Sequence, residues 1–274
     1  MTTTSGSTGR AVPENATHAV GPEVASPPPL LQLRGIAKHF GAVEALKHVD
    51  LDVPAGQVTA LIGDNGAGKS TLIKAVAGIY PPSSGEIFWE GQRVTLHSPR
   101  AAEELGIATV YQDLALCDNL DIVQNMYLGH EATKHGTLDE ITMELETRRV
   151  LTELSVFTVR SVRQLVGSLS GGQRQAIAVA RAVMHESKLV IMDEPTAALG
   201  VTQTAQVLEL ITRLASRGIA VLVISHNLND VFTVADRIAV MYLGTLVECG
   251  PIANYDTTRA VELITTGAGA RVEG

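Results

Sequence analysis

The sequence predicts an α/β fold with a mixed, largely parallel sheet, an antiparallel β lobe and an inserted helical lobe. Short apolar runs typical of buried strands alternate with helical stretches, which favours parallel pairing. Residues 31–36 and 86–89 indicate strands of a lobe rich in hairpins. Residues 114–167 are mostly helical and contain no run typical of a buried strand, so we expect them to form the inserted lobe. The runs typical of buried or sheet strands are residues 58–62, 107–110, 189–192 and 219–224.

Local signals place the remaining elements. The turn at residues 81–85, PPSSG, precedes the strand at 86–89, and Ser98 followed by Pro99 predicts a helix start. Gly244 lies at the centre of a predicted hairpin. The helices expected between the later strands cover residues 173–185 and 202–217.

The length and composition allow one large folded domain. The 274 residues are 45% hydrophobic, enough for a full core. Residues 1–29 are rich in Thr, Ser, Gly and Pro, and we expect a disordered tail. The folded domain is expected at residues 30–255 and a C-terminal extension at 256–274.

Charge and composition exclude several classes of protein. The net charge of −8 argues against binding nucleic acid, which draws on clustered lysine and arginine. Cys117 and Cys249 lie far apart and indicate neither a disulfide framework nor a zinc site. No apolar stretch approaches the roughly 18 residues of a membrane span, and the first residues lack the features of a secretory signal. We expect a soluble chain inside the cell.

A phosphate-binding loop is the strongest motif. The stretch GDNGAGKS matches G-x-x-x-x-G-K-[ST] and lies between the strand at 58–62 and a helix that ends near Gly78. Lys69 would reach the β- and γ-phosphates, and Ser70 would offer its hydroxyl to Mg²⁺. The alternative is a glycine-rich turn followed by Lys-Ser by chance. The strand before the loop and the helix after it argue against this alternative. The candidate nucleotide-binding residues here are Gly63, Asp64, Asn65, Gly66, Ala67, Gly68, Lys69, Ser70 and Thr71.

Two acids follow the strand at 189–192. Asp193 would point into the ligand crevice at the carboxyl edge of the sheet and hold Mg²⁺ through a water molecule. Glu194 could orient and deprotonate a water that attacks the γ-phosphate. Two solvated acids capping a strand would be the alternative.

Two further polar residues follow strands at the same edge. His226 comes directly after the strand at 219–224, and we expect it to contact the γ-phosphate or to hold the attacking water. A lone histidine after a strand is more often structural. Gln112 follows the strand at 107–110 and is a candidate catalytic and metal-binding residue.

A second anion-binding element is the stretch LSGGQRQ at residues 169–175. Ser170, Gly171, Gly172 and Gln173 lie at the start of a predicted helix, whose dipole and free N–H groups favour an anion. Spacing does not decide whether it meets the nucleotide of its own chain or of another. A glycine turn with a serine cap is the alternative.

Taken in order, these motifs resemble the nucleotide-binding subunit of an ATP-binding cassette (ABC) transporter over residues 30–255. The elements are the loop from Gly63 to Ser70, Gln112, LSGGQ, the strand ending in Asp193 and Glu194, and His226. The resemblance implies ATP and Mg²⁺ as ligands and Phe40 as the aromatic side chain that stacks on adenine. An ordinary core residue at an exposed edge is the alternative for Phe40.

The resemblance also implies an assembly. In that family LSGGQ closes over the ATP held by the partner's loop, so two copies would form an ATP sandwich and drive transmembrane permease subunits. Stretches such as EPTAALGV are similar to importers of ribose, xylose or fructose. We therefore expect a homodimer at the cytoplasmic face of the inner membrane, supplied by an extracytoplasmic sugar-binding protein, with residues 114–129 facing the permease.

One departure and two alternatives accompany this interpretation. Where the family commonly has Asp after Ala-Leu, this chain has Gly200, which affects coupling between sites but not the metal and water positions. A soluble ABC ATPase acting on DNA or ribosomes would carry a coiled-coil insertion or two cassettes, and neither is found here. A regulatory module with little turnover is the third hypothesis, favoured by Gly200.

Overall fold

The computed structural model describes residues 1–2, 28–184 and 186–268. Most of the predicted disordered tail lies outside these residues, as do His185 and the last part of the predicted C-terminal extension, residues 269–274. No helix in the ranges just given is long and apolar enough to cross a bilayer.

A six-stranded sheet forms the centre of the molecule, in the order β12-β11-β3-β10-β9-β6. Five strands are parallel, and β12 pairs antiparallel with β11 at one edge, which confirms the mixed, largely parallel sheet. The strands are β3 (Val58–Gly63), β6 (Ile107–Val110), β9 (Leu189–Asp193), β10 (Ala220–Ile224), β11 (Arg237–Tyr242) and β12 (Thr245–Pro251).

A second, antiparallel sheet has the order β2-β1-β4-β5. The sequence indicated parts of β1 and β4 but neither β2 nor β5. The missed β2 has an irregular register with β1, and its first half is mostly exposed, so its side chains lack a clean alternation. The four strands are β1 (Leu31–Phe40), β2 (Val43–Val53), β4 (Ser84–Trp89) and β5 (Gln92–Val94).

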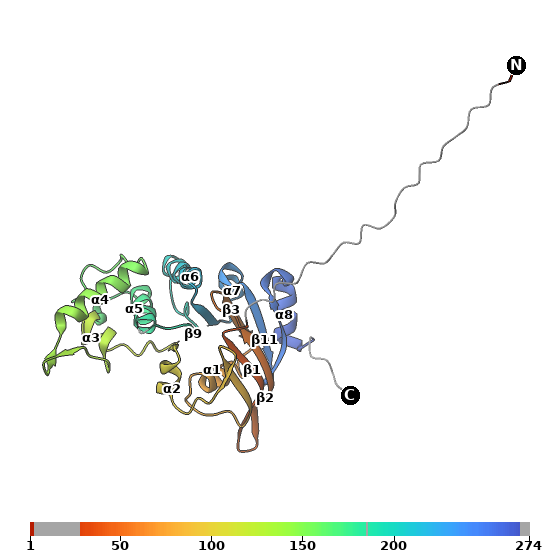
Figure 1. The fold of residues 1–274 in the computed structure, drawn as a ribbon, viewed down its shortest axis with the longest axis horizontal. Helices are drawn as coiled ribbons and strands as arrows, with labels where there is room; N and C mark the ends of the chain where they lie inside the picture. The colour runs from red at the N-terminus through yellow and green to blue at the C-terminus, as the bar shows by residue number, and fades with distance from the viewer. Residues whose placement is uncertain (3–27, 185, 269–274) are drawn as a thin grey trace.

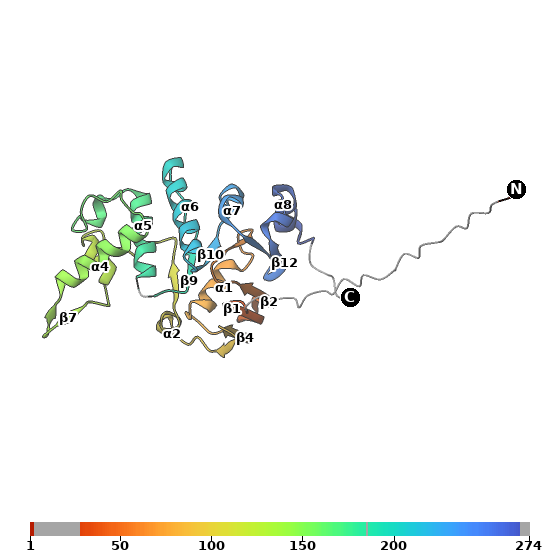
Figure 2. The same cartoon turned by 45° about the horizontal axis from the view of Figure 1, so that its top comes forward.

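The central sheet separates two apolar cores. Figures 1 and 2 show the helices and the second sheet that lie on either side of it. Alternate side chains of each strand enter opposite cores: on β3, Ala60 and Ile62 face one and Leu61 the other. The first core is covered by α5 (Gly171–Val183), α6 (Val201–Ser216), α7 (Leu228–Val234) and α8 (Thr257–Thr266). The second lies against α1 (Lys69–Val76), α2 (Pro99–Glu104) and the antiparallel sheet.

The C-terminal helix α8 belongs to this packing. Its Ala260 and Leu263 are fully buried in the first core, and the helix packs on β11. The segment after residue 255 therefore begins with a helix that is integral to the fold, although the sequence set it apart as an extension.

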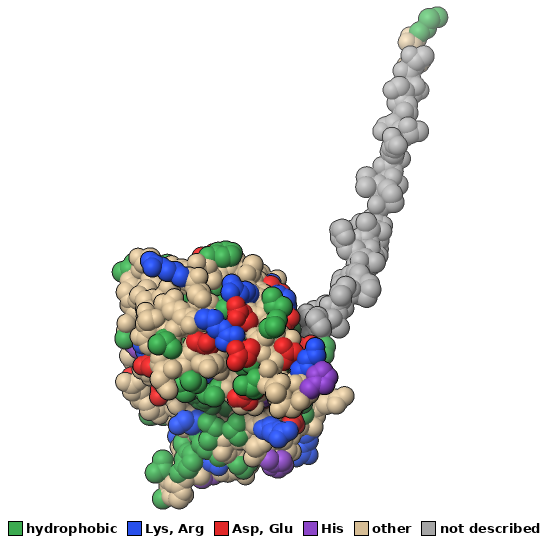
Figure 3. Space-filling model, turned by 90° about the vertical axis from the view of Figure 1, so that its left-hand side faces the viewer, with side chains coloured by type: hydrophobic (Ala, Val, Ile, Leu, Met, Phe, Trp, Pro, Cys, Tyr) green, Lys and Arg blue, Asp and Glu red, His purple; other side chains and the backbone are tan. Residues whose placement is uncertain are grey.

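The helical lobe lies at one end of the molecule, on the left of Figure 1. It contains α3 (Ile122–Tyr127), α4 (Glu140–Glu153), the 3-10 turn η1 (Val166–Ser168) and a small exposed hairpin of β7 (Thr133–Lys134) and β8 (Thr137–Leu138). Figure 3 views the molecule from this end, and acidic and basic side chains lie next to one another across its face. The lobe joins the first core through buried residues that include Met143, Val150 and Leu151.

Candidate active site

A cleft of about 660 Å³ lies at the carboxyl edge of the central sheet. In open α/β sheets this edge is where ligands bind. Segments from six different parts of the chain meet there, so only the fold brings them together. The lining residues are Val43, Glu44, Ala45, Lys47, Asn65, Gly66, Gly68, Lys69, Ser70, Thr71, Gln112, Asp193, Glu194, Ala197, Ile224, His226, Leu243 and Gly244.

The loop between β3 and α1 needs glycine for steric reasons. Gly63 has φ 154°, and a Cβ there would come within 2.4 Å of the Met241 carbonyl oxygen. Gly68 has φ 102°, and a Cβ would come within 2.8 Å of the Ala45 carbonyl oxygen. The loop is therefore wedged between β11 and β2, which holds its backbone N–H groups in a fixed arrangement suited to an anion.

Lys69 is held inside this loop. Its Nζ donates hydrogen bonds to the carbonyl oxygens of Gly63, at 2.6 Å, and Asp64, at 2.9 Å. Burial lowers the pKa of Lys69, while Glu194, Asp64 and Asp193 act in the opposite direction. A buried ammonium with acids nearby is positioned to neutralise phosphate oxygens.

Asp193 and Glu194 occupy the end of β9 as the sequence predicted. Burial, and next the charge of Glu194, raise the pKa of Asp193, while Lys69 and Lys74 lower it. Glu194 takes the left-handed conformation, with φ 52°, and its N–H donates to the Ile224 carbonyl at 2.9 Å. The backbone therefore turns sharply after Asp193, and both carboxylates reach the cleft.

His226 contacts Glu194 directly. The imidazole Nδ1 lies 2.8 Å from Glu194 Oε1, and both residues line the cleft. The histidine side chain is 71% exposed, whereas the glutamate side chain is only 17% exposed. His226 is thus free to face a ligand while one ring nitrogen remains tied to the carboxylate.

The oxygen donors at this edge fit a magnesium ion. Ser70, Gln112 and Asp193 line the same cleft and offer a hydroxyl, an amide and a carboxylate oxygen. Mg²⁺ is commonly held by one or two protein oxygens together with substrate phosphates and waters. In the described part of the chain no group of three or more His, Cys, Asp and Glu side chains could hold a metal ion, so a protein cage is not formed here.

Phe40 does not line the cleft. Its ring lies edge to face against Tyr80, with centroids 5.3 Å apart, and the Lys38 ammonium lies 5.3 Å from its centroid. The ring remains 47% exposed, and the adjacent residues Val43 and Glu44 do line the cleft. Stacking of adenine on Phe40 stays a prediction.

Sequence reasoning missed one wall of the cleft. Residues of β2 and of the β11–β12 turn approach the loop, where the Lys47 N–H donates to the Gly244 carbonyl and the Gly244 N–H donates to Ala67. The predicted hairpin at Gly244 was the available signal, but no local pattern indicated that β2 lies beside this hairpin. The missed lining residues are Val43, Glu44, Ala45, Lys47, Ala197, Ile224, Leu243 and Gly244.

The LSGGQ element does not line this cleft. Ser170 caps α5: its Oγ accepts from the Gln173 N–H at 3.4 Å, and Gln173 Oε1 accepts from the Ser170 N–H at 2.9 Å. Gln173 Nε2 also donates to the Thr158 carbonyl at 2.6 Å. The structure therefore shows the serine cap, and a role of this element in binding an anion stays a prediction. Ser170 and Gly171 are exposed at the helix start, and Gly172 is buried.

The fold and the cleft define a class of protein. A phosphate-binding loop after a central parallel strand, with two acids and a histidine at the ends of the adjoining strands, is the arrangement of an ATPase with a P-loop. The family model described as "ABC transporter" matches residues 46–197. The chain belongs to this family and is an ABC-type ATPase.

Curated relatives support the same assignment. The chain is 47% identical over 244 residues to the fructose import ATP-binding protein of Rhizobium meliloti, covering 86% of this chain and 94% of the relative. It is 46% identical to the xylose/arabinose import ATP-binding protein of Sulfolobus acidocaldarius, covering 80% and 86%. A ribose import ATP-binding protein of Yersinia pestis is 40% identical over 82% of this chain, which spans only 45% of that longer protein.

Solved structures agree with the fold. The chain resembles the ADP conformation of an ATP-binding cassette of an ABC transporter, with a TM-score of 0.74, 26% identity and coverage of 87% and 96%. A nucleotide-free cassette gives a TM-score of 0.71 at the same identity, with coverage of 84% and 96%. The predicted α/β P-loop fold is confirmed.

Proposed function

We propose that this chain hydrolyses ATP to power the import of a monosaccharide through transmembrane permease subunits. The observation that carries the proposal is the contact of His226 with Glu194, in the same cleft as Lys69 and Asp193. The names of the relatives, which import fructose, xylose or arabinose, and ribose, support the substrate class. The ribose import relatives are longer proteins, and this chain spans less than half of their length.

In this proposal the cleft positions the triphosphate and a water. Lys69 and the N–H groups of the loop bind the β- and γ-phosphates, which fixes the γ-phosphorus near Glu194. Glu194 accepts the proton of the attacking water, and His226 orients the carboxylate through Nδ1. The exposed Gln112, which also lines the cleft, contacts the water or the metal ion.

Mg²⁺, when bound, would neutralise charge on the β- and γ-phosphate oxygens. Ser70 and Asp193 would hold it, Asp193 through a water molecule, together with Gln112. A cation would favour ionisation of the half-buried Asp193 carboxyl, whose pKa is raised by burial and next by the Glu194 charge.

We further propose that two copies assemble around two nucleotides. The exposed Ser170 and Gly171 lie outside their own chain's cleft, which is what closure over a partner's ATP requires. Each complete site would then contain Lys69 of one chain and the signature of the other. ATP binding would close the dimer and hydrolysis would reopen it, so nucleotide turnover alternates two conformations.

The remaining partners follow from this role. Residues 114–129 would face the permease, and the chain would lie at the cytoplasmic face of the inner membrane through that contact. An extracytoplasmic sugar-binding protein would select the sugar together with the permease, so this subunit need not contain a sugar site. ATP and Mg²⁺ are its own ligands.

The enzymatic part is tested by phosphate release from MgATP, with the permease present. We expect hydrolysis that Glu194→Gln abolishes while nucleotide binding persists. Turnover that is unaffected by Glu194→Gln would contradict the assignment of the base. Uptake of labelled fructose, xylose and ribose by cells with and without the gene tests the substrate class, and unchanged uptake of all three would reject it.

A further inference from the structure

The two segments that carry Glu194 and His226 are joined a second time, outside the cleft. Thr196 Oγ1 donates a hydrogen bond to Asp230 Oδ2 at 2.6 Å. Thr196 lies two residues after Glu194, and Asp230 lies four residues after His226, in the first turn of α7. Neither Thr196 nor Asp230 lines the cleft. A hydrogen bond without a place in the cleft therefore links the same two segments as the contact of Glu194 with His226.

The pair is largely shielded from water. Asp230 is only 9% exposed, and Thr196 is half-buried. A hydrogen bond that a carboxylate accepts is shorter and stronger than one between neutral groups, which agrees with the distance of 2.6 Å. The cavity beside the pair has a volume of about 10 Å³, the lower limit for one water molecule. Loss of the Thr196 hydroxyl would therefore leave Asp230 Oδ2 without this partner and with little room for a water to replace it.

The Glu194 side of this link is fixed by its own backbone. The Glu194 N–H donates to the Ile224 carbonyl at 2.9 Å, and the Ala197 N–H donates to the Glu194 carbonyl at 3.1 Å. Pro195, which follows Glu194, is buried. The left-handed conformation of Glu194, which is unfavourable for glutamate, is thus held by contacts on both sides. Thr196 therefore presents its hydroxyl from a backbone that is fixed relative to the end of β10.

The His226 side has fewer attachments. In the described part of the chain, the contact with Glu194 is the only hydrogen bond of His226. Helix α7, which begins two residues later, has seven residues and is too short to be stable by itself. It is held by Val231, which is buried in the first core, and by Asp230. Because Asp230 lies in the first turn, its hydrogen bond fixes the start of α7, and with it His226, relative to Glu194.

We infer that the hydrogen bond between Thr196 and Asp230 positions the imidazole of His226 against the Glu194 carboxylate. Thr196 and Asp230 are positioning residues, because they act on the cleft only through the two residues that they hold together. The effect on turnover rests on the proposed function, in which Glu194 is the base. A merely structural role is the alternative, since an acid in the first turn also stabilises a helix through its dipole.

A first experiment measures the position of the imidazole in the purified chain, without nucleotide or permease. NMR of protein labelled with ¹⁵N-histidine reports the hydrogen bond at Nδ1, and His226→Ala identifies the signal. Thr196→Val, which replaces the hydroxyl by a methyl group, should move the Nδ1 shift toward that of a free imidazole. Thr196→Ser keeps the hydroxyl and should keep the shift of the parent protein. An unchanged shift in Thr196→Val would overturn the inference.

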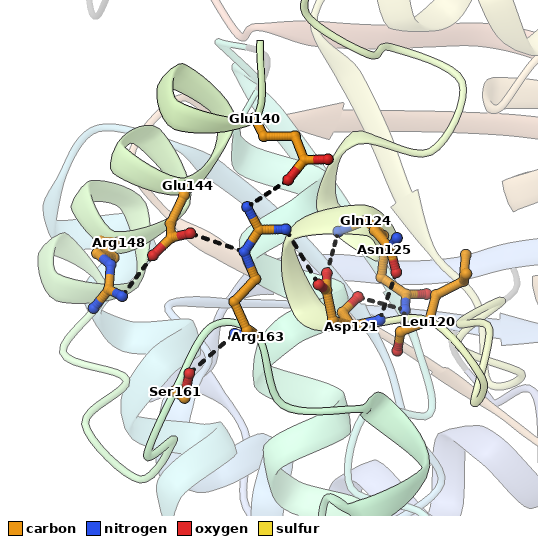
Figure 4. Close-up of polar contacts among 9 residues, drawn as sticks. All are labelled: Leu120, Asp121, Gln124, Asn125, Glu140, Glu144, Arg148, Ser161 and Arg163. Atoms are coloured by element: carbon orange, nitrogen blue, oxygen red, sulfur yellow. Dashed lines mark hydrogen bonds and ion pairs between the residues drawn. The ribbon is translucent and has the colours of Figure 1, made fainter. Parts of the chain in front are cut away.

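The matched control for the acid is Asp121, which Figure 4 shows at the start of the short helix α3. Its side chain is 13% exposed and pairs with Arg163 at 3.4 Å, outside the cleft. Asp230→Asn replaces the accepting carboxylate by a neutral amide and should shift the His226 signal as Thr196→Val does, to a smaller extent. Asp121→Asn should leave that signal unchanged. An equal shift in Asp121→Asn would assign the effect to general destabilisation and overturn the inference.

A second experiment measures MgATP hydrolysis by the complete transporter. Thr196→Val should lower kcat by roughly tenfold or more, because the orienting group is displaced. The KM should stay within about twofold, since the loop at Lys69 is unaltered, and Thr196→Ser should restore kcat. The control is Thr233→Val on the same helix, which removes a hydroxyl that donates to the Asn229 carbonyl at 2.7 Å. A preserved kcat in Thr196→Val, or an equal fall in Thr233→Val, would overturn the positioning role.

A double variant shows whether Thr196 acts through the histidine. In a His226→Ala background, Thr196→Val should change kcat by less than about twofold, because the side chain that it positions is absent. The same loss in that background as in the parent protein would show that Thr196 acts independently of His226, and would overturn the inference.

The experiments separate this inference from the proposed function. If Glu194→Gln leaves turnover intact, the proposed base is wrong, and the ring signal of His226 still tests the position of the imidazole. If turnover depends on Glu194 but Thr196→Val keeps both the ring signal and the kcat of the parent protein, only the inference fails.

Discussion

The Nδ1 atom of His226 lies 2.8 Å from Glu194 Oε1, and this contact joins the ends of two neighbouring strands. His226→Ala should lower kcat for ATP by about 100-fold, because the carboxylate loses the group that orients it. Nucleotide affinity should change little. The control is His48→Ala, which removes a histidine 3.5 Å from Asp50 on an exposed strand outside the cleft. Similar kcat values for the two variants would contradict a role for His226 in turnover.

Asp193 links stability to pH. Its folded-state pKa lies above its ordinary value of 3.8, so the folded chain binds this proton more tightly than the unfolded chain. The free energy of unfolding should therefore fall as pH rises from 3.8 through the raised pKa. Asp193→Asn should remove this decline and raise the urea midpoint at pH 7, while lowering MgATP hydrolysis by roughly 100-fold.

Urea unfolding in EDTA, followed by circular dichroism at several pH values, measures the effect without bound metal. Asp113→Asn serves as the control, because this exposed acid lies outside the buried edge. A lower midpoint for Asp193→Asn than for the parent at pH 7 would contradict the electrostatic argument.

The signature serine tests the two-chain site. Ser170→Arg should leave ATP binding by the isolated chain largely intact, because Ser170 does not line its own cleft, and should abolish dimer closure and turnover. Fluorescent nucleotide titration and phosphate release measure the two effects. Ser170→Ala loses the same helix cap, at about 1 kcal/mol, without the bulk of arginine. Loss of nucleotide binding in the isolated Ser170→Arg chain would return the motif to its own nucleotide.

Gly200 can accept the carboxylate that the family commonly carries. It has φ −74°, and a Cβ would meet only Gln203 Oε1, at 3.8 Å. Because Gly200 caps α6, Gly200→Asp should stabilise the chain by a few tenths of a kcal/mol, and it should increase the Hill coefficient for ATP. Val201→Asp, one residue further, adds the same charge without occupying the cap. A Hill coefficient that rises equally in both variants would assign the effect to charge alone.

The exposed Phe40 allows a test of adenine recognition. If adenine stacks on the exposed ring, Phe40→Ala should weaken ATP binding by roughly fivefold or more while the affinity for tripolyphosphate is kept. Phe157→Ala removes a more exposed ring from the helical lobe and should leave both affinities unchanged. An equal loss for ATP and tripolyphosphate would show that Phe40 supports the fold through Tyr80 instead.

Much of the central sheet could be predicted because its strands carry their own signals. The apolar runs of β3, β9 and β10 are bounded by motifs with fixed backbone requirements, and those motifs gave the loop around Lys69 and the acids after β9. The irregular strand β2 could not be predicted, because the side chains of its mostly exposed first half do not alternate regularly between buried and exposed. The wall it forms at the cleft, with Glu44 and Lys47, was missed for the same reason.

By itself, the sequence determined the chemistry of this protein. The apolar residues of the strands themselves indicate that these strands are buried. Parallel pairing then brings the residues that follow them to one edge of the sheet, namely Lys69, Asp193, Glu194 and His226. Only the tertiary structure decided which segments touch across the molecule. It placed LSGGQ outside its own cleft and tied Arg181 to the Ala115 carbonyl, because such contacts depend on how helices pack and not on any local pattern.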